Sequence, residues 1–197
     1  MKRIFVLFSL TGLLLMINPA LQAQERPNQF SAGYGVITVD EELAIIESVI
    51  SIVITEGNYN LDNQQMSGAI VFTYNYALSK VVHLGGAFVY ENITEDVMVN
   101  KEKKGEFRRD FYTIAAEGRF SYLNASFFQM YSGVGAGITF NTDKFISTDN
   151  SENSDTQTHF NFQINLLGLR VGNAFGAYAE LGYGYKGIVN AGLSLRL

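Results

Sequence analysis

The sequence predicts an all-β protein: an eight-stranded antiparallel up-and-down transmembrane β-barrel, with a short helix in the first external loop. Three observations carry this prediction. From about residue 29 to residue 197, large apolar side chains alternate with small, polar or charged ones. The alternating segments are about ten residues long, which is enough for a tilted strand to span a bilayer core with its side chains facing lipid and lumen in turn. Long and short connections follow one another between the segments.

The first 23 residues have the features of a secretory signal peptide. Lys2 and Arg3 precede a mostly apolar run from Ile4 to Ile17, and the small residue Ala23 follows. A basic start, an apolar stretch and a small residue are the parts of a cleaved export signal, so we expect cleavage after Ala23. The chain has no Cys that could carry a lipid anchor. The sequence therefore predicts an exported, unanchored domain over residues 24–197.

The composition of this domain excludes several kinds of function. Loss of residues 1–23 removes two basic groups and no acidic one, which changes the net charge from −5 to −7. An acidic chain argues against a nucleic-acid partner, because such affinity depends on Lys and Arg neutralising phosphates. Without Cys there is neither a disulfide framework nor a thiolate metal site. We expect no cofactor and no metal.

Period-two alternation predicts the positions of the eight strands. We place them near residues 29–38, 65–79, 81–92, 109–122, 125–141, 158–170, 174–185 and 187–197. The last strand shows the pattern well, with Val189, Ala191, Leu193, Leu195 and Leu197 on one face and Asn190, Gly192, Ser194 and Arg196 on the other. No stretch of the exported chain offers about twenty consecutive apolar residues, so a spanning helix is excluded. A closed sheet is the remaining way to satisfy the backbone within hydrocarbon.

Connection lengths and aromatic residues predict the orientation. Irregular connections follow the first, third and fifth strands (39–64, 93–108 and 142–157), whereas tight turns follow the second, fourth and sixth. Outer-membrane barrels have short periplasmic turns and long external loops, so we expect both termini to face the periplasm. Outward aromatic residues then sort into two interfacial belts: Phe30, Tyr76, Tyr122, Phe128 and Phe175 near the periplasmic end, and Tyr90, Tyr112, Phe140, Phe160, Tyr183 and Tyr185 near the external end.

Two segments carry a family resemblance. The opening from Phe30 to Val36 (FSAGYGV) and the closing stretch from Glu180 to Leu197 (ELGYGYKGIVNAGLSLRL) resemble small bacterial outer-membrane β-barrel domain proteins of the OmpA/OmpX type. The resemblance extends over nearly the whole exported chain and implies an eight-stranded barrel in the outer membrane. It implies little about activity, since barrels of this shape include structural proteins, adhesins and some lipid-modifying enzymes.

Polar residues with inward parity predict a plugged lumen. An eight-stranded barrel is only wide enough to be filled by side chains. The inward set includes Glu117, Arg119, Glu180, Arg196, His83 and Glu91. Because unpaired charges are costly out of water, we expect ion pairs, most directly between Glu180 and Arg196 on neighbouring strands. An ion path through these charges is the alternative.

The first long connection contains a stretch with helical spacing. Its apolar residues recur between Asp40 and Thr55, after a candidate capping box of Thr38 and Glu41. The alternative is a strand from Val49 to Thr55 that extends a hairpin. As a helix it is too short to cross a bilayer and too apolar to stand free in water. We therefore expect a lipid or partner contact through Leu43, Ile46, Val49, Ile50 and Val53.

The other long connections carry opposite charges. The second holds Lys101, Lys103, Lys104, Arg108 and Arg109, and the third holds Asp143, Asp149, Glu152 and Asp155. Solvated loop tips explain these charges most simply. The functional alternative is a basic tip that rests against phosphate groups of surface lipopolysaccharide.

We expect a non-enzymatic integral outer-membrane protein of structural or surface-interaction type. Its expected partners are outer-membrane lipid and the outer-membrane assembly machinery, and we expect a monomer; an external ligand or protein partner is not identified. One alternative is a lipid-modifying enzyme with His159 as a base. Another is a soluble lipocalin-like ligand-binding barrel, which would reverse the parity and place the apolar set inside.

Overall fold

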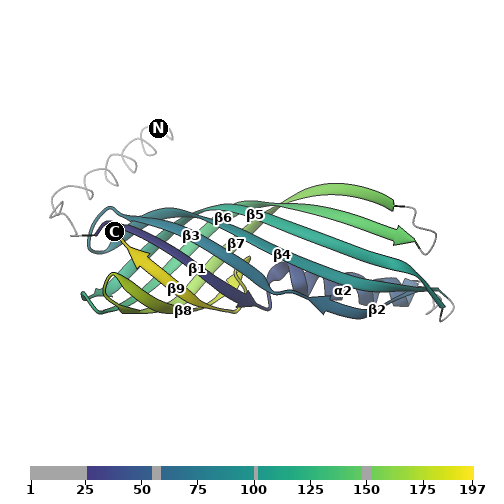
Figure 1. The fold of residues 1–197 in the computed structure, drawn as a ribbon, viewed down its shortest axis with the longest axis horizontal. Helices are drawn as coiled ribbons and strands as arrows, with labels where there is room; N and C mark the ends of the chain where they lie inside the picture. Colours follow the sequence, from purple (N-terminus) through teal and green to yellow (C-terminus); the bar gives the residue numbers. More distant parts are fainter. Residues whose placement is uncertain (1–25, 55–58, 100–101, 148–151) are drawn as a thin grey trace, which may run out of the picture.

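The protein, described by a computed structural model, is built almost entirely of antiparallel strands (Figure 1). The structure describes residues 26–54, 59–99, 102–147 and 152–197. The elements are β1 (Asn28–Val36), α2 (Val39–Ile54), β2 (Tyr59–Met66), β3 (Ala69–Ala77), β4 (Val82–Val99), β5 (Glu102–Asn124), β6 (Phe128–Ser147), β7 (Glu152–Gly172), β8 (Phe175–Gly184) and β9 (Val189–Arg196). The proposed signal peptide, residues 1–23, lies outside the described residues.

The sheet closes into a ring of eight strands. Its order is β4-β3-β1-β9-β8-β7-β6-β5, and β5 pairs again with β4. The first and last strands of the ring meet in the middle of this order, with Gln29 opposite Arg196 and Val36 opposite Val189. The predicted all-β, eight-stranded antiparallel barrel is thus confirmed. Closure leaves no edge within the ring, so each strand there has a hydrogen-bonded neighbour on both sides.

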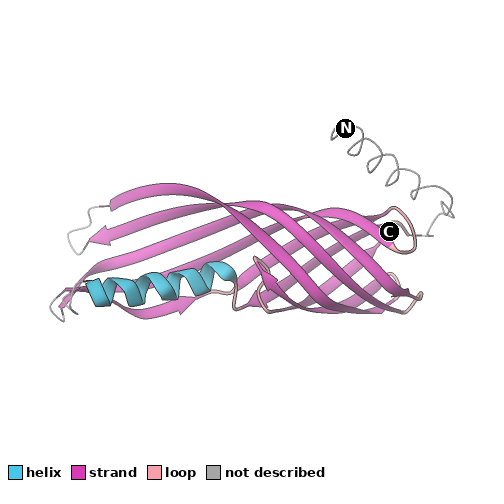
Figure 2. Cartoon of the chain, turned by 180° about the vertical axis from the view of Figure 1, so that it is seen from behind, coloured by secondary structure: helices cyan, strands magenta, loops and turns pink. Residues whose placement is uncertain are grey.

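The two ends of the ring differ in length, and we call them the turn end and the extended end. At the turn end, β3–β4, β5–β6 and β7–β8 are joined by short connections, and β1 begins beside the last residue, Leu197. At the extended end, β4, β5, β6 and β7 run on beyond the ring, and α2 and β2 lie along this extension (Figure 2). The extension is therefore an open, curved wall built on one side of the barrel.

Two of the predicted irregular connections are largely strands, which corrects the sequence interpretation. Residues 93–99 and 102–108 continue the β4–β5 ladder, and residues 142–147 and 152–157 continue the β6–β7 ladder. Charged residues lie on both faces there: Arg108 is opposite Lys144 and Arg109 is opposite Asp143. The apolar alternation that marks the ring is lost, although the backbone pairing continues.

The second predicted strand, 65–79, is divided in the structure between two strands, β2 and β3, which pair with the same neighbouring strand. Both β2 and β3 pair antiparallel with β4, at different heights, and residues 67–68 separate them. Gly68 has a positive φ of 68°, a conformation that glycine adopts without steric cost. This break lets β2 leave the ring and support the extension.

The first connection forms a helix, as the spacing of its apolar residues predicts, and not the alternative strand. The capping box is present: the Thr38 amide donates to the Glu41 carboxylate (3.0 Å), and the Glu41 amide donates to Thr38 Oγ1 (3.1 Å). These two bonds satisfy amide donors that the first helical turn leaves free. They fix where α2 begins, directly above the ring.

Large apolar side chains cover the outside of the ring. In β3 the residues alternate strictly, with Ile70, Phe72, Tyr74 and Tyr76 exposed and Val71, Thr73 and Asn75 buried. Exposed members from other ring strands are Phe30, Tyr34, Leu84, Phe88, Ile114, Phe120, Val134, Ile138, Phe160, Ile164, Leu181, Leu193 and Leu195. Among the described helices there is no segment long and apolar enough to cross a membrane.

The prediction that Tyr185 belongs to the external aromatic belt, which was based on the alternation, is wrong. Tyr185 is fully buried, and its hydroxyl donates to Glu117 inside the barrel (2.8 Å). The positive φ of Gly184, 140°, turns the chain after β8 and directs the following residues inward. The period of two ends with the strand, so it does not extend to Tyr185.

Candidate functional site

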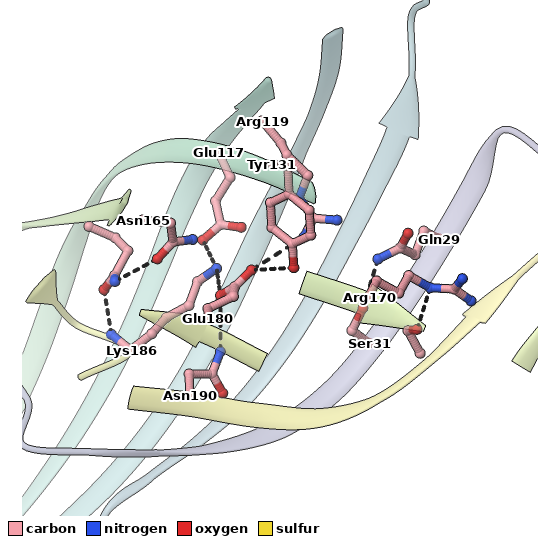
Figure 3. Close-up of polar contacts among 12 residues, drawn as sticks. Gln29, Ser31, Glu117, Arg119, Tyr131, Asn165, Arg170, Glu180, Lys186 and Asn190 are labelled. Carbon is pink, nitrogen blue, oxygen red and sulfur yellow. Dashed lines mark hydrogen bonds and ion pairs between the residues drawn. The ribbon is translucent and has the colours of Figure 1, made fainter. Parts of the chain in front are cut away.

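The centre of the lumen holds a network of paired charges (Figure 3). Glu117 comes from β5, Glu180 from β8, and Lys186 from the β8–β9 connection. The Lys186 ammonium lies 2.7 Å from Glu117 and 3.4 Å from Glu180, and Arg119 lies 3.5 Å from the other oxygen of Glu180. The Tyr131 hydroxyl donates to Glu180 at 3.0 Å. Two carboxylates are thus neutralised by two cations across the full width of the barrel.

Lys186 is the residue that sequence reasoning missed. The predicted strands 174–185 and 187–197 leave it in the connection between them, and its side chain is fully enclosed in the lumen. Gly184 and Gly187, with φ values of 140° and 87°, fold the connection back into the mouth, and the Lys186 amide donates to Gln163 (2.8 Å). The sequence feature that could have indicated this is the short connection between the last two strands, where Lys186 lies between Gly184 and Gly187.

Arg196 does not pair with Glu180, although their strands are neighbours. In the ladder, Glu180 lies opposite Asn190, which donates to it at 3.1 Å. Arg196 is six residues further along β9, a distance of about 20 Å at the rise of a strand. It donates to Gln29 instead, at 3.2 Å. The prediction that these two strands are neighbours is confirmed, but the register between them places Asn190, and not Arg196, opposite Glu180.

The remaining predicted lumen residues lie at opposite ends. His83 is buried near the turn end, in register with Arg119. Glu91 is buried near the extended end, where both of its oxygens accept from Thr38 Oγ1 at 2.9 Å. The lumen is therefore filled in layers: a layer at the turn end, the central charge network, and a layer under the helix.

Polar bonds tie the beginning of α2 to the barrel wall. Asp40 accepts from Asn161 (2.9 Å) and lies 2.9 Å from His159 Nε2, both on β7. On the other side of the helix, Tyr183 of β8 donates to Glu42 at 2.6 Å. The first turn of α2 thus acts as a cap over the lumen.

The helix packs on the extension with small and apolar contacts. Ala44 is buried with Ile93 of β4 and Phe111 of β5. Leu43 and Ile46, two of the predicted contact residues, are about half exposed, at 47% and 53%. The side chains of the other three, Val49, Ile50 and Val53, lie outside the described part of the structure.

Among the described residues, His159 has no hydrogen-bonded nucleophile. Asp40 orients His159 as a partner would orient a base, yet among the described residues the one side-chain hydrogen bond of His159 is to Asp40 itself. A nucleophile must lie within hydrogen-bond reach of its base. Across residues 26–54, 59–99, 102–147 and 152–197, there is also no group of three His, Asp or Glu side chains that could hold a metal ion. The arrangement is suited to closing and stabilising the lumen.

Comparison with known proteins finds similarity in structure and not in sequence. No protein-family profile matches the chain, and no curated protein matches its sequence. The chain is similar to the crystal structure of Ail, the attachment invasion locus protein of Yersinia pestis, with 13% identity and a TM-score of 0.45 over 87% of this chain and 95% of that one. A second Ail structure, in complex with the heparin analogue sucrose octasulfate, gives 14% identity and a TM-score of 0.44 over 86% and 95%.

Lys186→Met tests the central network. Removing this cation leaves two buried carboxylates with one Arg, and breaking a buried ion pair costs about 3–5 kcal/mol. We expect the free energy of unfolding, measured by urea titration of the folded barrel in detergent, to fall by about that amount. Lys103→Met, whose exposed ammonium lies beside Asp96, serves as the control, with a much smaller expected change. Adding Glu117→Gln to the Lys186 variant restores part of the loss. Equal small effects of both lysine variants contradict the network.

His159 and Tyr183 hold the first turn of α2 through two different acidic residues. His159→Ala removes the contact with Asp40, and Tyr183→Phe removes the hydrogen bond to Glu42. We expect each variant to lower the hydrogen-exchange protection of the Glu42–Ala44 amides, because the first turn of α2 then opens more easily. Unchanged protection in both variants contradicts the docking of α2 by these contacts.

Proposed function

We propose that this chain is an integral outer-membrane β-barrel protein of structural or surface-interaction type, exported by residues 1–23 and related to the OmpA/OmpX-type barrels. The observation that carries the proposal is the outer surface of the ring, where large apolar side chains are exposed on all eight strands. Exposed apolar patches of soluble monomers are usually limited to a few hundred Å². A continuous apolar belt around a closed barrel is suited to acyl chains.

The height of the apolar belt also supports a lipid surround. The nine residues of β3, at about 3.4 Å per residue and a tilt of about 40°, give a band about 23 Å tall. Outer-membrane barrels have an apolar band of about 25 Å. Aromatic rings lie at both edges, with Phe30 and Tyr76 near the turn end and Tyr112 and Phe140 near the extended end. On this proposal the turn end faces the periplasm and the extended end faces outward.

A plugged lumen favours a role in interaction and not in transport. The central charges are paired with one another, and α2 begins directly above them. A soluble lipocalin-like barrel would need the reverse arrangement, with an apolar cavity inside and charges outside. The part of the protein available to partners is therefore the extended end, with its wall of strands and its half-exposed helix.

We further propose that outer-leaflet lipid phosphates contact the wall at Arg108 and Lys144. These residues are directly opposite each other on β5 and β6, and both are exposed. Like charges in opposite positions destabilise a sheet unless an anion lies between them. They lie four residues beyond the Tyr112–Phe140 pair, about 10 Å above the edge of the apolar belt for a tilted strand. That height matches charged groups of surface lipids just outside the hydrocarbon.

Membrane fractionation tests the main proposal. We expect the mature chain to stay with the outer-membrane pellet after carbonate and high-salt washes, because burial of the apolar belt in lipid is insensitive to both. Detergent extraction should then release a form that migrates faster on gels unheated than boiled, as a folded barrel does. Release by carbonate alone, or recovery in the soluble periplasmic fraction, contradicts it. A lipid-modifying enzyme would instead turn over phospholipid, with loss of turnover in His159→Ala.

Paired substitutions test the lipid contact. Arg108→Gln with Lys144→Gln should weaken binding of the folded barrel to lipopolysaccharide in mixed micelles by about tenfold or more, since each cation near a charged surface contributes about 1 kcal/mol. Lys80→Gln removes a cation at the turn end, far from this wall, and should leave affinity nearly unchanged. Dephosphorylated lipopolysaccharide should bind both variants and the natural chain equally. Inorganic phosphate should compete weakly, because it lacks the acyl anchor. Equal losses in the two variants contradict the assigned contact.

A further inference from the structure

A groove crosses the apolar belt on the side of the ring formed by β8, β9, β1, β3, β4 and β5. It has a volume of about 640 Å³ and lies between two rows of exposed side chains on neighbouring strands. The row nearer the turn end contains Leu195, Phe30 and Tyr74, and the other contains Leu193, Phe72 and Phe88. Ser31 and Thr73, whose side chains face the lumen, also line the groove, so the sheet backbone forms its floor. Small-molecule sites commonly have volumes of about 300–1,000 Å³.

Two small residues deepen the groove. Ala32, which is exposed, lies opposite Phe72 in one row, and Gly86 lies opposite Tyr74 in the other. Apart from its chain neighbours, a Cβ atom at Gly86 would meet only the Ala115 carbonyl oxygen within 4 Å among the described residues, at 3.1 Å. The space at these two positions is therefore open, and an apolar chain can reach the backbone between the aromatic side chains.

The groove runs from one edge of the apolar belt to its middle. Phe175, the first residue of β8, lines it at the turn end. Ile114, which lines the other end, pairs with Phe88 midway along the ring ladder between β4 and β5. On the proposed orientation, the groove thus extends from the periplasmic edge of the hydrocarbon to the centre of the bilayer. A lipid acyl chain covers the same interval, which is half of a core about 30 Å thick.

Contacts among the wall residues hold the groove in shape. The rings of Phe30 and Tyr74 pack with their centroids 5.0 Å apart, and the Tyr74 hydroxyl donates to Asn28 (2.8 Å). In a membrane the hydrophobic effect does not distinguish this groove from the surrounding lipid, because lipid tails are equally apolar. Retention of one chain depends instead on many dispersion contacts with fixed walls. Large aromatic rings in fixed positions supply such contacts.

We propose that this groove binds one acyl chain of a diacyl phospholipid of the periplasmic leaflet and so retains that lipid on the barrel. The inference rests on the proposed membrane location and orientation. The chain enters beside Phe175, and its terminal methyl group lies near Ile114. Lipopolysaccharide is not the expected occupant, because its headgroup lies at the extended end, away from this entrance.

Spin-labelled phospholipids test the position of the chain on the folded barrel in detergent. A diacyl phosphatidylcholine carries a nitroxide either at the chain end or next to the headgroup, and side-chain methyl signals are followed by NMR. The chain-end label should broaden the Ile114 signal most, and the headgroup label should broaden the Leu195 signals most. Unlabelled dipalmitoyl phosphatidylcholine should reverse both effects. Uniform broadening of outward methyl groups around the ring, or broadening that the unlabelled lipid does not reverse, overturns the proposal.

Two substitutions to leucine form a matched pair. Ala32→Leu fills the groove, and Ala136→Leu makes the same change at an exposed position of β6, outside it. Native mass spectrometry of the folded barrel with dipalmitoyl phosphatidylethanolamine should show one retained lipid on the natural chain and on Ala136→Leu. Retention by Ala32→Leu should be about tenfold weaker. Equal retention by both variants overturns the proposal. Pairs of barrels without lipid, lost only in Ala32→Leu, overturn it in favour of a second copy of the chain.

Failure of the groove assignment is distinguishable from failure of the membrane assignment. Recovery of the mature chain in the soluble periplasmic fraction contradicts both. A chain that stays in the outer membrane but retains no phospholipid overturns the groove assignment alone. The same holds for a chain that retains lipopolysaccharide as well as it retains phospholipid, with the same loss in Ala32→Leu.

Discussion

Closure of the sheet by hydrogen bonds between β1 and β9 is the constraint on which the rest of the structure depends. The first and last ring strands pair over eight residues, from Gln29 with Arg196 to Val36 with Val189, so no ring strand has a free edge. Once every backbone group of the ring is paired, the outer face can be apolar without exposing polar backbone. Ring size then follows: eight strands enclose a space that side chains fill, and the inward residues must satisfy one another.

The side chains on the two faces of the ring require different surroundings. Outside, Phe72 and Leu193 need only an apolar surround, and little specificity is required of them. Inside, each charged side chain needs a specific partner of opposite charge. The Lys186 ammonium, which lies between Glu117 and Glu180, is an example. The charged side chains change along the axis of the lumen: basic residues lie at the turn end, paired charges in the centre, and carboxylates beneath the helix at the mouth. At the mouth, Asp40 contacts His159 and Asn161 of β7.

Much of the fold was readable from the sequence because a period of two reports one buried and one exposed face. The strands of the ring and their antiparallel closure were predicted on that basis, and the helix after Thr38 was predicted from its helical spacing and its capping box. The extension was not, because Arg108 and Lys144 on one face and Arg109 and Asp143 on the other remove the apolar signal while the ladder continues. Tyr185 was placed on the wrong face, and the inward direction of the Lys186 side chain was not predicted. Glycines with positive φ at 184 and 187 turn both residues inward where no strand period applies. Inward parity located Glu117, Arg119 and Glu180 in the lumen, but only the register could choose their partners.

The assignment of the outer face to lipid is tested most directly by site-directed spin labelling of the protein in outer-membrane lipid. The chain has no natural Cys, so single Cys residues can be introduced and labelled without further change. Labels at Phe72 and Leu193 should collide readily with dissolved oxygen and hardly at all with a water-soluble nickel reagent. Labels at Thr73 and Ser194, which face the lumen, should be shielded from both. Free access of the nickel reagent to Phe72 and Leu193 would contradict the account.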